Sequence, residues 1–277
     1  MGFESFIRRL RAPTRANTAA GLLDSFCLTL DVKPLTRDAL TLSQGSPAMQ
    51  RDVVYLFHMA QYFDEYIGAF RSARRSSTFS VKSISAQLAT TTEALAALIR
   101  FSTVSNDDDP FTREGLPIAS HQRMMFDLQF HFIIFDVLVA PFTAYTSEVE
   151  SNTRGASAPR RRLPKLPLTG GAVDIKDLLA PQNDGLHTVC RLCYRLLKQM
   201  IKGSGIFASH LSPFIPYMCS QDGLKLHVAD TMLAIFTDND RLAATVIREV
   251  AEHYTMLLRT KSRSSGYLKF LSAMCCV

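Results

Sequence analysis

Apolar residues recur every three or four positions along most of the chain, with polar residues between them. This spacing places the apolar side chains on one face of an α-helix, whereas a half-buried strand would alternate apolar and polar residues. No run of alternating valine, isoleucine and threonine predicts a strand, so the expected fold class is all-α. The helical spacing covers residues 56–70, 84–99, 125–139, 186–201, 242–258 and, more briefly, 268–275.

The helix ends are marked less clearly than the helix bodies. Pro141 is expected to end the helix over 125–139, because proline cannot continue a helical ladder. Asp238 or Asp240 could accept hydrogen bonds from the first free amides of the helix over 242–258.

Three stretches interrupt the helical pattern and divide the chain. Residues 102–119 are acidic and then contain proline and glycine, which predicts a surface connection. Residues 143–173 are rich in Ser, Thr, Pro, Gly and Arg and predict a flexible basic loop. Residues 1–49 hold one apolar patch and receive no assignment. Two helical regions remain, 50–142 and 174–277, and their helices need stacked neighbours to bury their apolar faces. An α-solenoid of antiparallel helix pairs is therefore favoured over a simple bundle.

Composition adds limits on location and partners. The chain has 277 residues, 47% of them hydrophobic, and a net charge of +6 that is spread along the sequence. The six cysteines lie mostly in apolar stretches, which is typical of reduced thiols in a cytosolic compartment. The start lacks the apolar core of a signal peptide. The longest apolar run, FHFIIFDVLVAPF, is too short to span a membrane and contains His131 and Asp136.

The stretch CRLCYRLLKQMIKGSG, at 190–205, contains a Cys-x-x-Cys motif. A zinc site would need a second ligand pair, and the adjacent Cys275 and Cys276 are poorly placed to supply one. A thioredoxin-like site would need a strand before the motif, but here the motif lies inside a helical pattern. We therefore interpret Cys190 and Cys193 as two buried thiols on the apolar face of a helix, and expect no metal or cofactor.

The same helix carries a row of cations. Arg191, Arg195, Lys198 and Lys202 share one face, nearly opposite the apolar one, and no acid occurs between Asp184 and Asp222. Two interpretations are open. The row is a solvated helix face, or it is a set of cations without counterions that could meet phosphates.

Other patterns that could carry chemistry are weak. Asp107, Asp108 and Asp109 are consecutive, unlike the spaced ligands of a calcium loop. The arginines at 160–162 lack interleaved aromatic residues, so nucleic-acid binding is not expected. No HExxH pair, glycine-rich phosphate loop or nucleophile elbow is present, and we expect no enzymatic activity.

Two long segments resemble a known family. CRLCYRLLKQ, followed by VADTMLAIFTDNDRLAATVIREVAEHYTMLLRTKSRSSGYLKFLSAMCCV, resembles the RIH domain of intracellular calcium-release channels. Upstream, TTEALAALIRFSTVSNDDDP and HQRMMFDLQFHFIIFDVLVAPF resemble the preceding helices of the inositol 1,4,5-trisphosphate receptor, which is closer than the ryanodine receptor. The resemblance covers about 84–142 and 174–277 and implies an armadillo-like fold. It also implies partners among the other domains or subunits of a tetrameric channel in the endoplasmic-reticulum membrane.

The resemblance gives a test for ligand binding. The family places an Arg-x-x-x-Lys-x-x-Arg run before its "APF" sequence, and gapless counting puts those positions on Ala119, Arg123 and Phe126. It places a Tyr-Arg-Lys triplet after the Cys-x-x-Cys helix, and those positions fall on Ser204, Gly205 and Ile206. Losing four cationic contacts, at roughly 1–3 kcal/mol each, predicts weak or absent binding of inositol trisphosphate. The remaining candidate ligand contacts are Arg123, Lys198 and Lys202.

We therefore expect a cytosolic armadillo/RIH segment of an inositol-trisphosphate-receptor-like channel, on the cytosolic face of the endoplasmic reticulum. Its role would be to couple ligand or subunit state to the channel by rigid-body movement of packed helices. The sequence has neither the pore helices nor the β-trefoil domains of such receptors, so it is expected to be no pore by itself. The alternative is a stand-alone cytosolic α-solenoid that binds a protein partner through its concave face.

Overall fold

The structure is a computed structural model that describes residues 46–73, 80–143, 170–237, 239–260 and 265–274. The chain divides into two compact units. The first comprises residues 1–58 and 147–161, of which only the start of one helix, 46–58, is described. The second comprises residues 59–146 and 162–277 and contains all the features discussed below.

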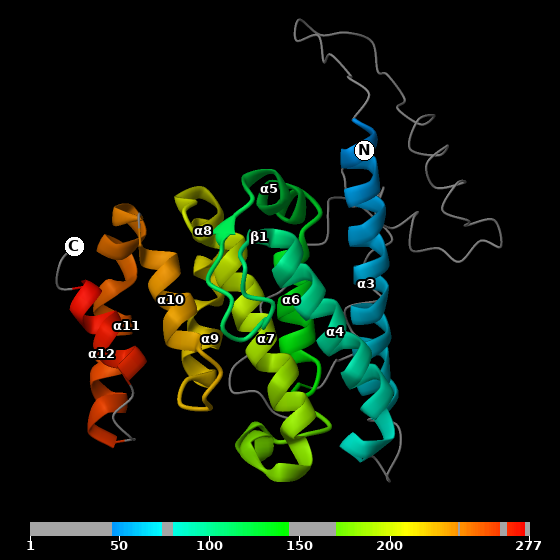
Figure 1. Cartoon of the computed structure of the whole chain (residues 1–277). Helices are drawn as coiled ribbons and strands as arrows, with labels where there is room; N and C mark the ends of the chain where they lie inside the picture. The colour runs from blue at the N-terminus through cyan, green and yellow to red at the C-terminus, as the bar shows by residue number, and fades with distance from the viewer. Residues whose placement is uncertain (1–45, 74–79, 144–169, 238, 261–264, 275–277) are drawn as a thin grey trace, which may run out of the picture. The chain divides into compact units, whose positions relative to one another are not determined.

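The described residues confirm the all-α, armadillo-like α-solenoid expected from the sequence. In chain order the α-helices are α3 (Pro47–Ala73), α4 (Ser85–Ser102), α5 (Ala119–Asp127), α6 (Phe130–Val139), α7 (Asp184–Ile201), α8 (Gly205–Leu211), α9 (Ile215–Gln221), α10 (Val228–Phe236), α11 (Asp240–Thr260) and α12 (Ser265–Met274). Short 3-10 turns are η1 (Val81–Ile84), η3 (Ile175–Leu179), η4 (Pro181–Asn183) and η5 (Ser212–Phe214). Figure 1 shows α4, α6 and α7 side by side, with α10 beyond α7.

Helix α7 lies at the centre of the helical packing in the second unit. It packs against α4, α6 and α10, and also contacts α5 and α8. Its buried side chains include both cysteines, Tyr194 and a set of leucines that lie on several sides of the helix. A helix that is apolar on more than one side needs neighbours on each of them, and these helices supply them.

The last helices form a second group beside α10. Helix α12 packs against both α10 and α11, and the ring of Phe270 lies 4.4 Å from Tyr254 of α11 and 5.8 Å from Phe236 of α10. These aromatic contacts bury the stripe that the sequence pattern predicted over 242–258, at least for the residues from Val250 onward whose side chains are described.

The single helix expected over 125–139 is wrong, because the chain forms two helices there. Gln129 adopts a left-handed conformation with φ of 59°, and its amide donates to the Phe126 carbonyl at 2.8 Å. This turn ends α5 and reorients the chain, so α6 begins at Phe130. Helix α6 then ends at Val139, two residues before Pro141, as expected.

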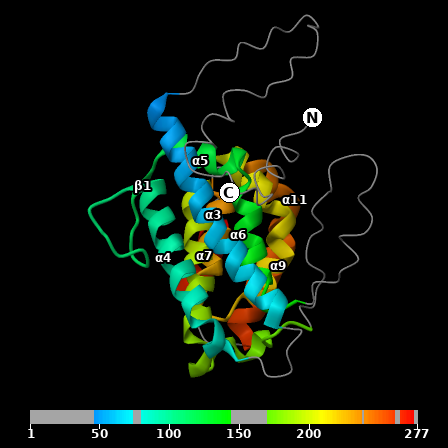
Figure 2. The same cartoon turned by 90° about the vertical axis from the view of Figure 1, so that its right-hand side faces the viewer.

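The connection between α4 and α5 also differs from a plain surface loop. Its ends pair as a two-stranded antiparallel ladder, β1 (Thr103–Val104) and β2 (Leu116–Pro117), which the sequence did not predict. We call residues 103–117 the flap. Figure 1 shows it crossing in front of α7, and Figure 2 shows it at the left edge beside α4.

The expected basic loop at 143–173 is described only at its ends. Thr143 and Gly170 form an isolated antiparallel bridge, and the Val173 amide donates to the Pro141 carbonyl at 3.0 Å. The arginines at 160–162 lie outside the described residues, as do 1–45 and the Cys275–Cys276 pair. Helix α3 begins at Pro47, within the segment that the sequence left unassigned.

Truncating Leu197 should test whether α7 is the centre of the core. Its side chain is fully buried, so Leu197→Ala should reduce the free energy of unfolding by about 2–5 kcal/mol. Leu116→Ala removes the same atoms from a side chain that is 75% exposed and should change stability by less than about 0.5 kcal/mol. Chemical denaturation followed by circular dichroism measures both. Equal losses in the two variants would contradict the central position of α7.

Candidate functional site

The cationic row of α7 is covered by the flap. One of the two interpretations was a set of cations without counterions, and this is wrong, because Glu114 supplies a counterion from 81 residues before Arg195. Arg195 is 4% exposed and Lys198 is half-buried, so the face is not freely solvated either. The two interpretations of the sequence both assumed an open helix face, whereas the folded chain closes it.

Three cations meet the Glu114 carboxylate. Oε1 accepts from Arg195 Nη1 at 2.7 Å and from Lys198 Nζ at 2.8 Å. Oε2 lies 3.7 Å from Lys202 Nζ, which is beyond hydrogen-bond distance. Lys202 donates instead to the Gly115 carbonyl at 3.2 Å. A single carboxylate thus faces three cations that are spread over about two helix turns.

The flap is built to hold Glu114 in place. The Arg113 guanidinium is buried and points back into the flap, where Nε donates to Thr103 Oγ1 and Nη2 to the Thr103 carbonyl, both at 2.8 Å. Its Nη1 donates to the Asp107 carbonyl. Gly115 must be glycine at this point, since an added Cβ would lie 2.4 Å from the Val104 carbonyl oxygen. Arg113 and Gly115, the two neighbours of Glu114, thus both lie against strand β1 and fix the position of Glu114.

Hydrogen bonds to backbone carbonyls complete the attachment of α7 to the flap and to α5. The Arg113 carbonyl accepts from Arg195 Nη2 at 2.8 Å and from Gln199 Nε2 at 3.2 Å. From α5, Gln122 Nε2 donates to the carbonyls of Gln199 and Lys202 at 2.8 and 3.0 Å. The last carbonyls of a helix have no partner within it, so Gln122 caps the end of α7.

Arg191, the first cation of the row, makes different contacts. Its guanidinium carbon lies 4.7 Å from the centre of the Phe111 ring, a cation–π distance. Its Nη2 lies 3.5 Å from His227 Nε2, and His227 Nδ1 lies 3.1 Å from Asp230 Oδ2. Assigning the proton to Nδ1 lets His227 donate to Asp230 and accept from Arg191. The flap therefore covers all four cations of the row.

The pKa of the Glu114 carboxyl reflects this environment. Burial raises the pKa, but hydrogen bonds from Lys198 and Arg195, and the charges of both, outweigh burial and lower it below its ordinary value of 4.5. The carboxyl is consequently ionised at neutral pH and carries the negative charge that the row requires.

The three residues proposed from sequence as ligand contacts do not form one site. Lys198 and Lys202 meet at Glu114, whereas Arg123 lies on the exposed side of α5 and pairs with Asp127 at 3.8 Å. Ser204 is the N-cap of α8, where its hydroxyl accepts from the Phe207 amide, and Ile206 is 75% exposed. The positions at which the family places its basic triplet thus start a helix here.

Cys190 and Cys193 are fully buried on α7 and free of disulfides. Burial raises the pKa of Cys190 to about 12 and that of Cys193 well above its ordinary value. Neither thiol is available as a thiolate at neutral pH, which is the form that binds metals or attacks disulfides. Within the described ranges, no group of three or more His, Cys, Asp or Glu side chains could hold a metal ion.

The aspartates at 107–109 serve local structure. Asp107 accepts from the Asp109 amide at 3.0 Å and from the Thr112 hydroxyl at 2.7 Å. Asp109 accepts from the Phe111 amide at 3.0 Å. Hydrogen bonds to side chains and amides of this kind fix a turn, and here they shape the tip of the flap.

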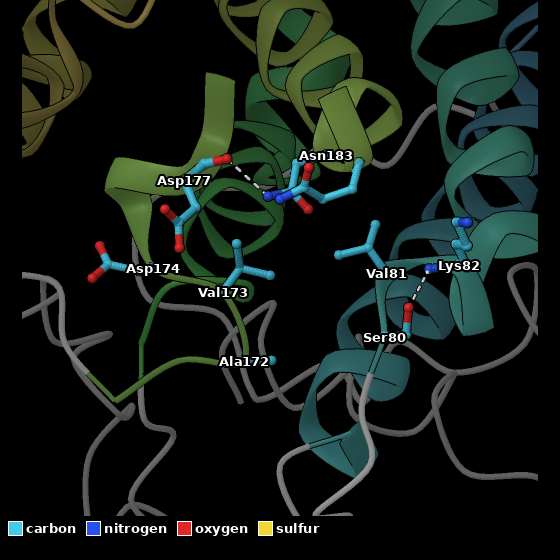
Figure 3. A pocket seen from close by; sticks show the side chains of 9 residues that line it. Ser80, Val81, Lys82, Ala172, Val173, Asp174, Asp177 and Asn183 are labelled. Carbon is cyan, nitrogen blue, oxygen red and sulfur yellow. Dashed lines mark hydrogen bonds between the residues drawn. The ribbon is translucent and has the colours of Figure 1, made fainter. Parts of the chain in front are cut away.

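A cavity of about 280 Å³ lies away from the flap, between the start of η1 and the turns η3 and η4 (Figure 3). Several of its polar groups are hydrogen-bonded within those turns, as Figure 3 shows for two pairs. Ser80 Oγ accepts from the Lys82 amide, and the Asp177 carbonyl accepts from Asn183 Nδ2 at 2.8 Å. None of the residues proposed from sequence lines it, and its lining is Ser80, Val81, Lys82, Ala172, Val173, Asp174, Asp177, Gln182 and Asn183.

Sequence reasoning missed Glu114, Arg113 and Gln122 as site residues. Each lies in or next to a segment that was assigned to a surface connection, and each acts on a helix more than 70 residues away. The sequence holds no local signal for them, because the ladder that positions Glu114 has only two residues in each strand and the burial of Arg113 shows only in the folded chain.

Comparison with known proteins agrees with the sequence resemblance. The family model RYDR_ITPR, described as the RIH domain, matches residues 92–277, which is more than half of the chain. The match includes the flap, α7 and all later helices. No curated protein matches the chain. Among the described helices, none is both long enough and apolar enough to cross a membrane.

Replacing Glu114 should destabilise the fold in a pH-dependent way. Glu114→Gln leaves buried Arg195 without its counterion and should lower the free energy of unfolding by about 1–3 kcal/mol at neutral pH. Because the folded-state pKa of Glu114 is lowered, its contribution is present above pH 4.5 and is lost as the pH falls through the folded-state pKa. The difference in the free energy of unfolding between the wild type and Glu114→Gln should therefore be constant from neutral pH down to mild acid and then disappear.

Denaturation curves at several pH values measure this difference. Asp108→Asn removes a charge of the same sign from an exposed side chain of the same flap and is the control, with an expected change below about 0.5 kcal/mol. A pH-independent loss in Glu114→Gln would argue against the ion cluster.

The buried thiols should resist alkylation. In the native chain at pH 8, Cys190 and Cys193 should remain unlabelled by iodoacetamide, and both should be labelled after unfolding. Mass spectrometry of peptides reports each cysteine separately. Rapid native labelling, or labelling that appears only after a chelator is added, would point to an exposed or metal-bound pair instead.

Proposed function

Because the chain belongs to the RIH-domain family, we propose that it is the cytosolic armadillo/RIH segment of an inositol-trisphosphate-receptor-like calcium-release channel. In this proposal it couples the state of neighbouring domains or subunits to the channel at the cytosolic face of the endoplasmic reticulum. It conducts no ions itself, catalyses no reaction and binds inositol trisphosphate weakly.

One observation carries the proposal, namely that the cationic row of α7 is paired inside the part of the chain that the structure describes. Arg195, Lys198 and Lys202 face Glu114, and Arg191 faces Phe111. A trisphosphate site needs several converging donors that are free to replace water around the phosphates. The family's other basic positions fall here on Ala119, Phe126 and residues 204–206, and these supply no cation.

The packing of α7 supports a mechanical role. The helix contacts α4, α6 and α10 through buried side chains and is tied to the flap by ion pairs and carbonyl bonds. Close-packed interiors transmit displacements because they have few voids to absorb them. A movement imposed on any of these helices would then reach the others as a rigid-body shift.

Isothermal titration of the purified chain with inositol trisphosphate tests the ligand part of the proposal. We expect no measurable heat at concentrations at which a family receptor's ligand-binding region, used as the positive control, is saturated. A dissociation constant in the micromolar range or tighter would contradict it.

The channel part of the proposal needs a test in the cells that make the protein. A tagged chain should fractionate with endoplasmic-reticulum membranes, and its full transcript should encode β-trefoil modules upstream and membrane helices downstream. A transcript that encodes only the helical region, together with a chain that stays in the cytosolic fraction, would favour a stand-alone α-solenoid scaffold instead.

A further inference from the structure

The charge around Glu114 is not balanced within the cluster. Three cations surround one carboxylate, at 2.7, 2.8 and 3.7 Å. Two further acids lie within electrostatic range of the cluster. Hydrogen bonds from Thr112 to Asp107 and from His227 to Asp230 lower the pKa values of these acids most, and the charges of Arg195 and Lys198 lower them further. The charge of Arg113 acts on Asp107 and that of Lys269 on Asp230, so each of these acids has a further cation nearby and the cluster keeps its excess of positive charge.

The geometry of the cluster suits an anion with more oxygens than a carboxylate has. Oε1 serves both Arg195 and Lys198, while Oε2 does not reach Lys202. A phosphoryl group carries up to two negative charges and three acceptor oxygens, so it could accept one bond from each of the three cations. The Glu114 side chain is also 49% exposed, so a competing anion can approach it from solvent.

We propose that Glu114 is an internal ligand in a phosphoryl-binding site formed by Arg195, Lys198 and Lys202, and that it masks this site. A phosphoryl group displaces the Glu114 side chain into solvent and takes its place on the three cations. The flap stays attached, because the Arg113 and Gly115 carbonyls still accept from Arg195, Gln199 and Lys202. The biological setting rests on the proposed function, whereas the site itself does not, since it uses none of the positions at which the family places its ligand contacts.

The test compares Glu114→Gln with the wild-type chain in binding tripolyphosphate, at constant ionic strength so that general screening is equal. Removing the internal competitor should tighten binding by at least about tenfold. Asp108→Asn, which removes an equal charge from the same flap, should bind as the wild type does. Adding Lys198→Gln to Glu114→Gln should abolish the gain. Isothermal titration gives the affinities.

Three results would overturn the site: no gain in Glu114→Gln, an equal gain in Asp108→Asn, or a gain that survives Lys198→Gln. If Glu114→Gln does not fold, the thermal midpoint of the wild-type chain provides a second measurement. Saturating tripolyphosphate should raise it, and Lys202→Gln should remove the rise. A rise that persists in Lys202→Gln contradicts the proposal.

A second arm identifies the source of the phosphoryl group. Glu114→Gln is mixed with vesicles that contain a phosphorylated phosphatidylinositol or with vesicles of equal charge made with phosphatidylserine. If the ligand is a lipid headgroup, the variant should co-sediment with the first kind of vesicle and not with the second. Binding to tripolyphosphate alone supports the site with a soluble ligand. Tight binding of inositol trisphosphate by the wild-type chain would contradict the proposed function. The site proposed here would still be judged by the ratio of the tripolyphosphate affinities of Glu114→Gln and the wild type.

Discussion

The structure depends on how helix α7 buries its polar side chains. A buried charge or amide costs several kcal/mol unless it is hydrogen-bonded in place. Arg195 and Gln199 are both buried, and their partners are the Glu114 carboxylate and the Arg113 carbonyl of the flap. The flap thus accepts hydrogen bonds from Arg195 Nη1 and Nη2 and from Gln199 Nε2, and the remaining sides of α7 pack against α4, α6 and α10. The connection between α4 and α5 therefore helps to stabilise the core around α7.

The same contacts that stabilise α7 also remove its cations from ordinary ligand chemistry. A helix that carries four basic residues on one face has the composition of an anion site, yet each of them has a partner inside the molecule. The RIH-domain match spans this region, while the positions at which the resemblance expects cationic ligand contacts, 119, 126 and 205–206, carry no cation. A fold and a ligand site depend on different residues, so a domain can keep one without the other.

The sequence predicts what is local and misses what is distant. The helices over 56–70, 84–99 and 186–201 follow from their apolar spacing, because that spacing is set within the helix itself. The break at Gln129 depends on one left-handed residue, and the ladder that closes the flap has two residues in each strand. The sequence has no acid between Asp184 and Asp222, but an acid from another part of the chain lies beside α7 in the folded structure. That acid is Glu114, 81 residues before Arg195, and a pattern confined to one helix cannot reveal it.

An internal counterion also sets the scale on which this region can respond to a ligand. Charged hydrogen bonds of the kind Glu114 makes are worth about 1–3 kcal/mol each, which is the range of coupling free energies measured between allosteric sites. An anion that competes with Glu114 must overcome that amount before it gains affinity, so binding stays weak while the carboxylate is in place. By linkage, a movement that draws the Glu114 side chain away from α7 would raise the affinity of the row for anions, and anion binding would favour that movement by the same factor. The covered row would then report on the position of Glu114, which is what a coupling module requires of one of its contacts.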